Sequence, residues 1–248
     1  MKKVAYLCAV LGSISFVEAE DVVVTESTEE TSVVGEHGLY YAFGLLMCNS
    51  GERVDNYRDG VRTVQTNSFK THMGGTLALG YQFMPKDKPL CIGLELGSDF
   101  SPRQEEVNNG NYVRIVGREY IYNQTLTRNG FRPFVALRLG YVNYANKFIV
   151  YCKGGMSYAA SKDKYDLYDV MNTITTADSV IKCNCWTPIV ALGLEKSFTK
   201  DFTWRGEAEY KFARTMDHGH GNGTCTKFMQ KGSFNVRVLF CHNIHLNH

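Results

Sequence analysis

The chain has 248 residues, and its 27 Lys and Arg against 25 Asp and Glu give a formal net charge of +2, which provides no electrostatic footprint for nucleic acid. Charged residues make up 21% of the sequence, and no window holds the roughly 18 apolar residues that a membrane-spanning helix needs, so a helical membrane bundle is excluded. The 15 Tyr, 14 Phe and 23 Gly beside only 5 Pro favour strands and tight turns.

Residues 1–19 have the layout of a secretory signal peptide. A basic start at Lys2 and Lys3 precedes an apolar run, and Ala19 follows the small and medium-sized residues typical of a cleavage site. We predict cleavage after Ala19, with an uncleaved anchor as the alternative. Residues 20–37 are rich in Glu, Thr, Ser and Val, and we expect them to form a solvated N-terminal tail.

From residue 38 onward, apolar residues recur at every second position in eight segments, which is the period of a half-buried strand. Long and short connections alternate between these segments, so an antiparallel arrangement places all long loops at one end. We predict an all-β, eight-stranded up-and-down barrel over residues 38–241, followed by a tail over 242–248. The predicted strands are Leu39–Cys48, His72–Met84, Leu90–Phe100, Phe131–Tyr141, Phe148–Tyr158, Trp186–Phe198, Phe202–Phe212 and Phe234–Phe240.

The two faces of these segments differ in a way that predicts a membrane barrel. One face carries branched and aromatic residues, and the other mixes charges with small residues such as Gly80, Gly140 and Gly193. Small residues beside long charged ones suit a narrow closed interior, so the apolar face is expected to meet lipid. A soluble, lipocalin-like barrel, with its apolar residues inside, is the alternative. Outward aromatic residues near the strand ends are expected to form headgroup girdles: Tyr81, Phe83, Phe100, Tyr141, Phe198, Phe202, Trp204 and Phe240.

Three stretches carry a family resemblance: the hairpin from Leu77-Ala78-Leu79-Gly80-Tyr81 to Gly93-Leu94-Glu95, then Leu137-Arg138-Leu139-Gly140-Tyr141 and Val190-Ala191-Leu192-Gly193-Leu194. On these the chain resembles the small bacterial outer-membrane β-barrel family, which includes opacity-type surface proteins and the transmembrane domain of outer membrane protein A. The resemblance covers residues 38–241 and implies an eight-stranded barrel in the outer membrane of a Gram-negative bacterium. The family usually ends on an aromatic residue, which Phe240 matches, although the chain continues to His248. Members serve as adhesins, immune targets or structural envelope proteins.

Ten charged residues, five of each sign, fall on the face predicted to line the barrel lumen. An eight-stranded barrel has room inside only for side chains, and buried charges must be paired. We therefore predict a plug of ion pairs, with a gated ion path as the alternative. Catalysis by Glu207 and Glu209 is disfavoured because Arg205 and Lys211 flank them. The ten residues are Glu95, Asp99, Arg138, Lys153, Glu195, Arg205, Glu207, Glu209, Lys211 and Arg237.

The cysteines offer a second kind of candidate site. Export would leave seven of the eight, so at least one is expected to be free, buried or intermolecular. We predict a loop disulfide from Cys225 to Cys183 or Cys185. Metal binding by these thiols with His218 and His220 is the alternative, but their spacing matches no known site.

The long connections are expected to carry the function. Residues Tyr112 to Val116 alternate and should pair above the membrane, and Tyr165 to Asn172 could form one or two helical turns. A lipid-modifying hydrolase would need Ser98 beside a histidine at the same depth, which the pattern does not supply.

The sequence thus predicts a monomeric surface protein with no catalytic residues, no cofactor, no metal and no nucleic-acid partner. Its lumen would be plugged, and it would contact outer-membrane lipid along its strands. Four long extracellular loops would give it a structural, adhesion or host-interaction role toward host or envelope proteins. A narrow porin-like ion channel is the alternative function.

Overall fold

The computed structural model describes residues 38–58, 61–85, 88–115, 118–169, 174–199, 201–221 and 224–245. The predicted signal peptide and N-terminal tail lie outside the described residues. The described residues form twelve strands: β1 (Gly38–Arg58), β2 (Val61–Phe83), β3 (Leu90–Phe100), β4 (Gln104–Ile115), β5 (Arg118–Arg128), β6 (Phe131–Asn143), β7 (Phe148–Asp169), β8 (Ile174–Ser197), β9 (Phe202–Lys211), β10 (Arg214–Gly221), β11 (Thr224–Gln230) and β12 (Ser233–His245).

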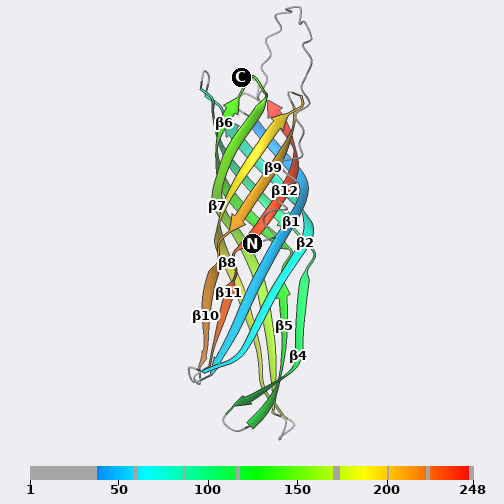
Figure 1. Cartoon of the computed structure of the whole chain (residues 1–248), viewed down its shortest axis with the longest axis vertical. Helices are drawn as coiled ribbons and strands as arrows, with labels where there is room; N and C mark the ends of the chain where they lie inside the picture. Colours follow the sequence, from blue (N-terminus) through cyan, green and yellow to red (C-terminus); the bar gives the residue numbers. More distant parts are fainter. Residues whose placement is uncertain are drawn as a thin grey trace, which may run out of the picture. The chain divides into compact units, whose positions relative to one another are not determined.

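Eight of these strands close a barrel in the order β1–β2–β3–β6–β7–β8–β9–β12, and β12 pairs again with β1 (Figure 1). Each neighbouring pair is antiparallel. The predicted eight-stranded up-and-down barrel is therefore confirmed. Short connections such as Tyr144 to Lys147 lie at one end, which we call the turn end.

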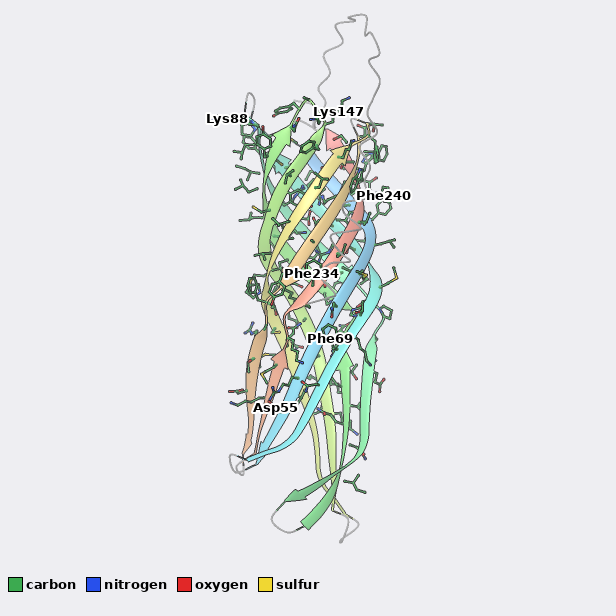
Figure 2. The ribbon with its side chains drawn as sticks, in the orientation of Figure 1. Asp55, Phe69, Lys88, Lys147, Phe234 and Phe240 are labelled. Atoms are coloured by element: carbon green, nitrogen blue, oxygen red, sulfur yellow. The ribbon has the colours of Figure 1, made fainter. Side chains whose placement is uncertain are left out.

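Side chains alternate between the lumen and the outer surface along each barrel strand. On β8, for example, Leu192 is 70% exposed while its neighbour Ala191 is 5% exposed. Apolar side chains surround the barrel on its outside, as the sequence predicted (Figure 2). Such a continuous apolar surface is stable in lipid rather than in water.

Aromatic side chains cluster at two levels of this apolar belt. Phe240 lies toward the turn end, and Phe69 and Phe234 lie near the middle of the molecule (Figure 2). Tyr158 and Trp186 pack together at the second level, with ring centroids 5.5 Å apart. Two such levels match the aromatic girdles that flank a hydrocarbon core.

The segments predicted as long loops are instead largely strands, which corrects the sequence interpretation. β1 and β2 remain paired from Cys48 to Arg58, and β7 and β8 remain paired as far as Asp169 with Ile174. The helical turns expected from Tyr165 are wrong, because β7 continues through that position; residues 170–172 lie outside the described part. We call this continuation of the barrel beyond the apolar belt the extension.

Two hairpins complete the extension. β4 and β5 pair with each other, so the expected strand pairing beyond the belt at Tyr112 is confirmed, and β5 also pairs with β7. β10 and β11 pair with each other, and β11 pairs with β1. At the other end of the chain, β12 continues to His245, past the predicted boundary at residue 241.

The extension is divided into two four-stranded sheets, because two barrel pairings stop at the belt. The β2–β3 pairing ends at Gly75 with Phe100, and the β8–β9 pairing ends at Ile189 with Lys211. Among the described residues, no pairing joins β2 to β4 or β8 to β10. One sheet is therefore β10–β11–β1–β2 and the other is β4–β5–β7–β8; the two open boundaries are called the β2–β4 seam and the β8–β10 seam.

A proline stands at the start of each seam. The Ser101 N–H donates to Gly130 O on the β6 side, so the next residue, Pro102, faces β2, where it has no N–H to offer. At the other seam, the Phe212 N–H donates to Pro188 O, so the missing N–H of Pro188 also faces β9. Each ladder ends where a donor is absent, which gives a local cause for both seams.

Candidate functional site

The barrel lumen is filled by polar and charged side chains between two apolar clusters. Near the turn end it is closed by buried Met84, Val142 and Ile149. All ten of the charged residues predicted to face the lumen are at most 4% exposed. Nine of the ten belong to one connected set of ion pairs, which we call the lumen network: Glu95, Asp99, Arg138, Lys153, Glu195, Arg205, Glu207, Glu209 and Arg237.

Two arginines cross the lumen at the part of the network nearest the turn end. Arg138 Nη2 lies 2.8 Å from Glu195 Oε2, and Arg205 Nη2 lies 3.0 Å from the same oxygen. Arg205 Nη1 also reaches Glu95 Oε2 at 2.5 Å. Because β3 and β9 lie opposite each other in the strand order of the barrel, the contact between Arg205 and Glu95 ties opposite walls together.

Two tyrosines hold these arginines in place. The guanidinium of Arg138 lies 4.0 Å from the ring centroid of Tyr151, and that of Arg205 lies 4.8 Å from the ring centroid of Tyr40. The Tyr40 hydroxyl donates to Glu95 Oε2 at 2.8 Å and accepts from Arg138 Nη1 at 3.1 Å. Ring stacking and hydrogen bonding together satisfy charges that would otherwise be costly to bury.

Glycines on neighbouring strands make room for the tyrosines. A Cβ added to Gly80 would overlap the Tyr40 ring, and one added to Gly193 would overlap the Tyr151 ring. The mixture of glycine and charge on the inward face is thus a packing requirement, because each glycine leaves the space that a tyrosine fills.

A lysine links the two halves of the lumen network. Lys153 Nζ lies 3.0 Å from Glu95 Oε1 and 2.6 Å from Glu207 Oε2. The Tyr151 hydroxyl donates to the other oxygen of Glu207 at 2.5 Å. Both oxygens of this carboxylate are therefore occupied by donors from the lumen.

Arg237 organises the end of the network nearest the extension. Its guanidinium lies 2.7 Å from Asp99 Oδ2 and 2.7 Å from Glu209 Oε2. Thr76 Oγ1 donates to Asp99 at 2.7 Å, and Asn235 Nδ2 donates to Glu209 at 2.8 Å. The carboxylates here are saturated with donors in the same way.

Lys211, the tenth predicted lumen residue, lies apart from the network. Its Nζ donates to Ser157 Oγ at 3.2 Å, and none of the described carboxylates forms an ion pair with it. Sequence reasoning placed it correctly on the inward face. It missed Tyr40, Tyr151 and Thr76, whose only signal was that each occupies an inward position of its strand.

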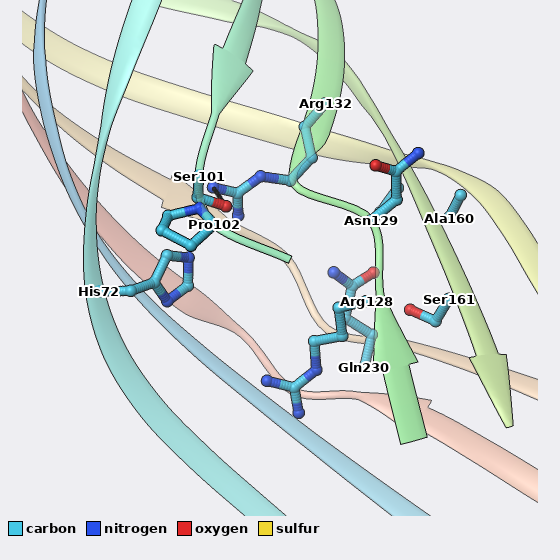
Figure 3. A pocket seen from close by; sticks show the side chains of 10 residues that line it. His72, Ser101, Pro102, Arg128, Asn129, Arg132, Ala160, Ser161 and Gln230 are labelled. Atoms are coloured by element: carbon cyan, nitrogen blue, oxygen red, sulfur yellow. Dashed lines mark hydrogen bonds between the residues drawn. The ribbon is translucent and has the colours of Figure 1, made fainter. Parts of the chain in front are cut away.

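Beyond Lys211, the lumen opens into a small cationic cavity that we call the mouth pocket. His72, Arg128 and Arg132 project toward it from three different strands or their ends, with Ser101 and Gln230 nearby (Figure 3). Arg132 Nη2 contacts Cys48 Sγ at 3.1 Å and Ser101 Oγ at 3.4 Å. The pocket offers about 30 Å³ to the centres of water-sized molecules, which suits a small polar group but not a drug-sized ligand.

The cysteine predictions are only partly covered by the structure. Cys185 is a free, buried thiol whose Sγ lies 3.7 Å from Gln230 Oε1, so a disulfide through Cys185 is wrong. The side chains of Cys183, Cys225, His218 and His220 lie outside the described side chains. No cluster of three His, Cys, Asp or Glu that could hold a metal occurs among the described residues.

No helix in the described part of the chain is both long and apolar enough to cross a membrane. No protein-family model and no curated protein sequence matches the chain.

Several solved structures are similar to this chain. Ail, the attachment invasion locus protein of Yersinia pestis, matches with 9% identity and a TM-score of 0.34 over 80% of this chain and 98% of its own. The outer membrane protease OmpT from Escherichia coli matches with 12% identity and a TM-score of 0.44 over 84% and 96%. A major outer membrane protein from Thermus thermophilus matches with 12% identity and a TM-score of 0.40 over 80% and 99%. The Escherichia coli and Thermus thermophilus proteins are named as outer-membrane proteins.

Proposed function

We propose that this chain is a surface interaction protein of a Gram-negative outer membrane. Its belt would anchor it in lipid, and the extension would contact host or envelope proteins in an adhesive or structural role. In this proposal the turn end faces the periplasm and the extension faces outward, as expected for barrels with short turns on one side.

The observation that supports this proposal most is the contrast between a filled lumen and a large extension. The lumen holds nine charged side chains joined in ion pairs, whereas β7 alone continues nine residues beyond Ala160, about 30 Å of strand. A barrel that served only as an anchor would not need strands of 20 or more residues such as β1, β2, β7 and β8.

We propose no catalytic residue, cofactor or metal, and a monomeric barrel. The carboxylates of the lumen network are held by cations, and Ser98 is buried with its hydroxyl 3.4 Å from the Asp99 carbonyl oxygen. These contacts support structural roles for groups that could otherwise act as acids or nucleophiles.

Adherence of bacteria tests the proposal. Cells that display the full chain are compared with cells that display a trimmed chain, in which residues 50–70, 103–129, 160–184 and 213–232 are replaced by short Gly-Ser turns. We expect the full chain to raise adherence to cultured epithelial cells and the trimmed chain to leave it at background. Equal adherence, with both chains confirmed at the cell surface by labelling, would contradict the interaction role.

A narrow ion channel is the second candidate, and the charged lining of the lumen favours it. Conductance across a planar bilayer decides between the two. We expect a silent bilayer with the full chain, because opening a path would break several buried ion pairs at once. Stable unitary current steps that scale with salt would favour the channel.

A further inference from the structure

The two seams expose strand edges whose backbone groups lack a sheet partner on one side. Among the described residues, β2 pairs only with β1 from Val61 to Gly74, and β4 pairs only with β5. Along such an edge, alternate residues direct both N–H and C=O outward. Exposed edges of this kind are templates for another strand.

The two seams differ in how readily their edges can accept an added strand. At the β8–β10 seam, the Arg214 guanidinium donates to the Trp186 carbonyl oxygen and so bridges the opening. β10 is also only eight residues long and is interrupted by a bulge at Gly219 to Gly221. Short, bulged and charged edges are the features that block strand addition.

The β2 edge at the β2–β4 seam has none of these protections over residues 64–69. Its sequence there, Val-Gln-Thr-Asn-Ser-Phe, contains no charge and no proline, and its register with β1 is regular. The irregularity in the β1–β2 pairing begins just past this stretch, between Asn56, which pairs with Val64, and Tyr57, which pairs with Arg62. This edge is therefore suited to pair with an extended polypeptide.

The mouth pocket lies beside the base of the same seam. His72 comes from β2, and Ser101 and Pro102 come from the β3–β4 link on the opposite side of the seam. Arg128 and Arg132 add two guanidinium groups to this pocket (Figure 3). A strand placed in the seam would direct alternate side chains inward, where a carboxylate fits the size and charge of the pocket.

We propose that the β2–β4 seam binds an extended segment of a partner protein by strand addition to β2, with an acidic side chain of that segment seated in the mouth pocket. This inference rests on the proposed interaction function and specifies its partner chemistry. Backbone pairing supplies general affinity, and the guanidinium groups select for the acidic residue.

A displayed library of random decapeptides, panned against the full chain in lipid nanodiscs, tests this proposal. We expect enriched peptides to share an acidic residue and to slow amide exchange of residues 64–69 when bound. N-methylation of alternate backbone nitrogens should weaken binding, because it removes the donors that pair with β2. The methylated peptides are tested on the unaltered chain, so this result does not depend on the folding of a variant.

The pocket is tested with Arg132→Gln, with Lys196→Gln at an exposed position near the turn end as the control. Loss of a charge-assisted hydrogen bond should weaken binding roughly tenfold or more for Arg132→Gln, and binding by Lys196→Gln should be unchanged.

Three results would overturn the inference. Panning could enrich no peptides beyond those enriched on the trimmed chain, N-methylated peptides could bind as tightly as unmethylated ones, or the bound peptide could slow amide exchange only outside β2. Protection of residues 64–69 that rises with protein concentration in the absence of peptide would instead assign the edge to a second copy of this chain. Adherence that depends on the extension, without peptide binding, would leave the proposed function standing and reject this inference alone.

Discussion

The barrel and its extension share four strands, β1, β2, β7 and β8, but are held together differently. Within the belt, every barrel strand pairs on both sides, and the lumen is filled by a network of ion pairs that joins opposite walls. Beyond the belt, β1, β2, β7 and β8 continue and are joined by the β4–β5 and β10–β11 hairpins, but no pairing takes over from β2–β3 or β8–β9, so two sheets remain. Because each open boundary begins beside a proline that lacks a donor on that side, we infer that Pro102 and Pro188 end these two ladders.

Charged residues also contribute differently to stability in the barrel and in the extension. Charges in the lumen are desolvated, so removal of one member leaves its partners uncompensated, whereas exposed charges on the extension, such as Arg103, remain in water and contribute little. We therefore expect stability to reside in the belt and binding to reside in the extension. The following predictions test this division.

The largest effect is expected from Arg205→Met. Glu95 and Glu195 would each lose an ion-pair partner in the lumen, and breaking such buried pairs costs about 3–5 kcal/mol. Urea unfolding of the chain in detergent micelles measures this loss in the free energy of unfolding. The matched control is Arg103→Met on the exposed surface, for which we expect a change within about 0.5 kcal/mol. Equal losses in the two variants would show that the lumen network does not stabilise the barrel.

A smaller loss is expected from Gly193→Ala. The new methyl group would overlap the Tyr151 ring and displace the hydroxyl that binds Glu207, at a cost of about 1–3 kcal/mol. Gly154→Ala is the control, because a Cβ there meets no atom within 4 Å, and it should stabilise the strand by roughly 0.5–1 kcal/mol. The same unfolding experiment applies, and opposite signs for the two variants are the expected outcome.

Pro102→Val should lengthen the β2–β3 pairing of the barrel toward the extension. It restores an N–H on the side that faces β2, so the β2–β3 ladder can lengthen by one hydrogen bond, which contributes about 1 kcal/mol. Amide exchange measured by mass spectrometry should then slow at residues 72–74. Unchanged exchange would mean that the missing donor is not what opens this seam. Pro133→Val offers a comparison at a proline within β6 that does not border a seam.

The smallest effect is expected from Lys211→Met. Lys211 is buried but contacts Ser157 rather than a described carboxylate, so its removal leaves no described carboxylate without an ion-pair partner. We expect the free energy of unfolding to change by less than about 1 kcal/mol, against about 3 kcal/mol for Lys153→Met, which leaves Glu95 and Glu207 without their lysine. If the two variants lose a comparable free energy of unfolding, Lys211 contributes to the lumen network as much as Lys153 does.

The sequence determined much of the barrel by itself. A period of two over eleven residues fixes which side chains share a face, and small residues beside charges indicate which face is enclosed. For that reason Arg138, Glu195 and the other lumen residues could be assigned to the interior before any contact was known. The pairing partners could not be assigned, because Arg205 meets Glu95 from 110 residues away and only the closed register brings them together.

The extension was misread for a related physical reason. Strands of the extension bury polar as well as apolar residues, such as Asp55, Gln124 and Leu126, so they need no strict apolar alternation. The sequence of β2 from Val61 to Lys70 therefore looks like a loop. Their strand character comes from pairing with β1, which is a tertiary property. Pro102 and Pro188 can be identified in the sequence. Strand register, however, determines which neighbouring strand each proline leaves without a hydrogen-bond donor. The sequence alone thus determined an enclosed charged lumen, and only the tertiary structure decided where the barrel opens.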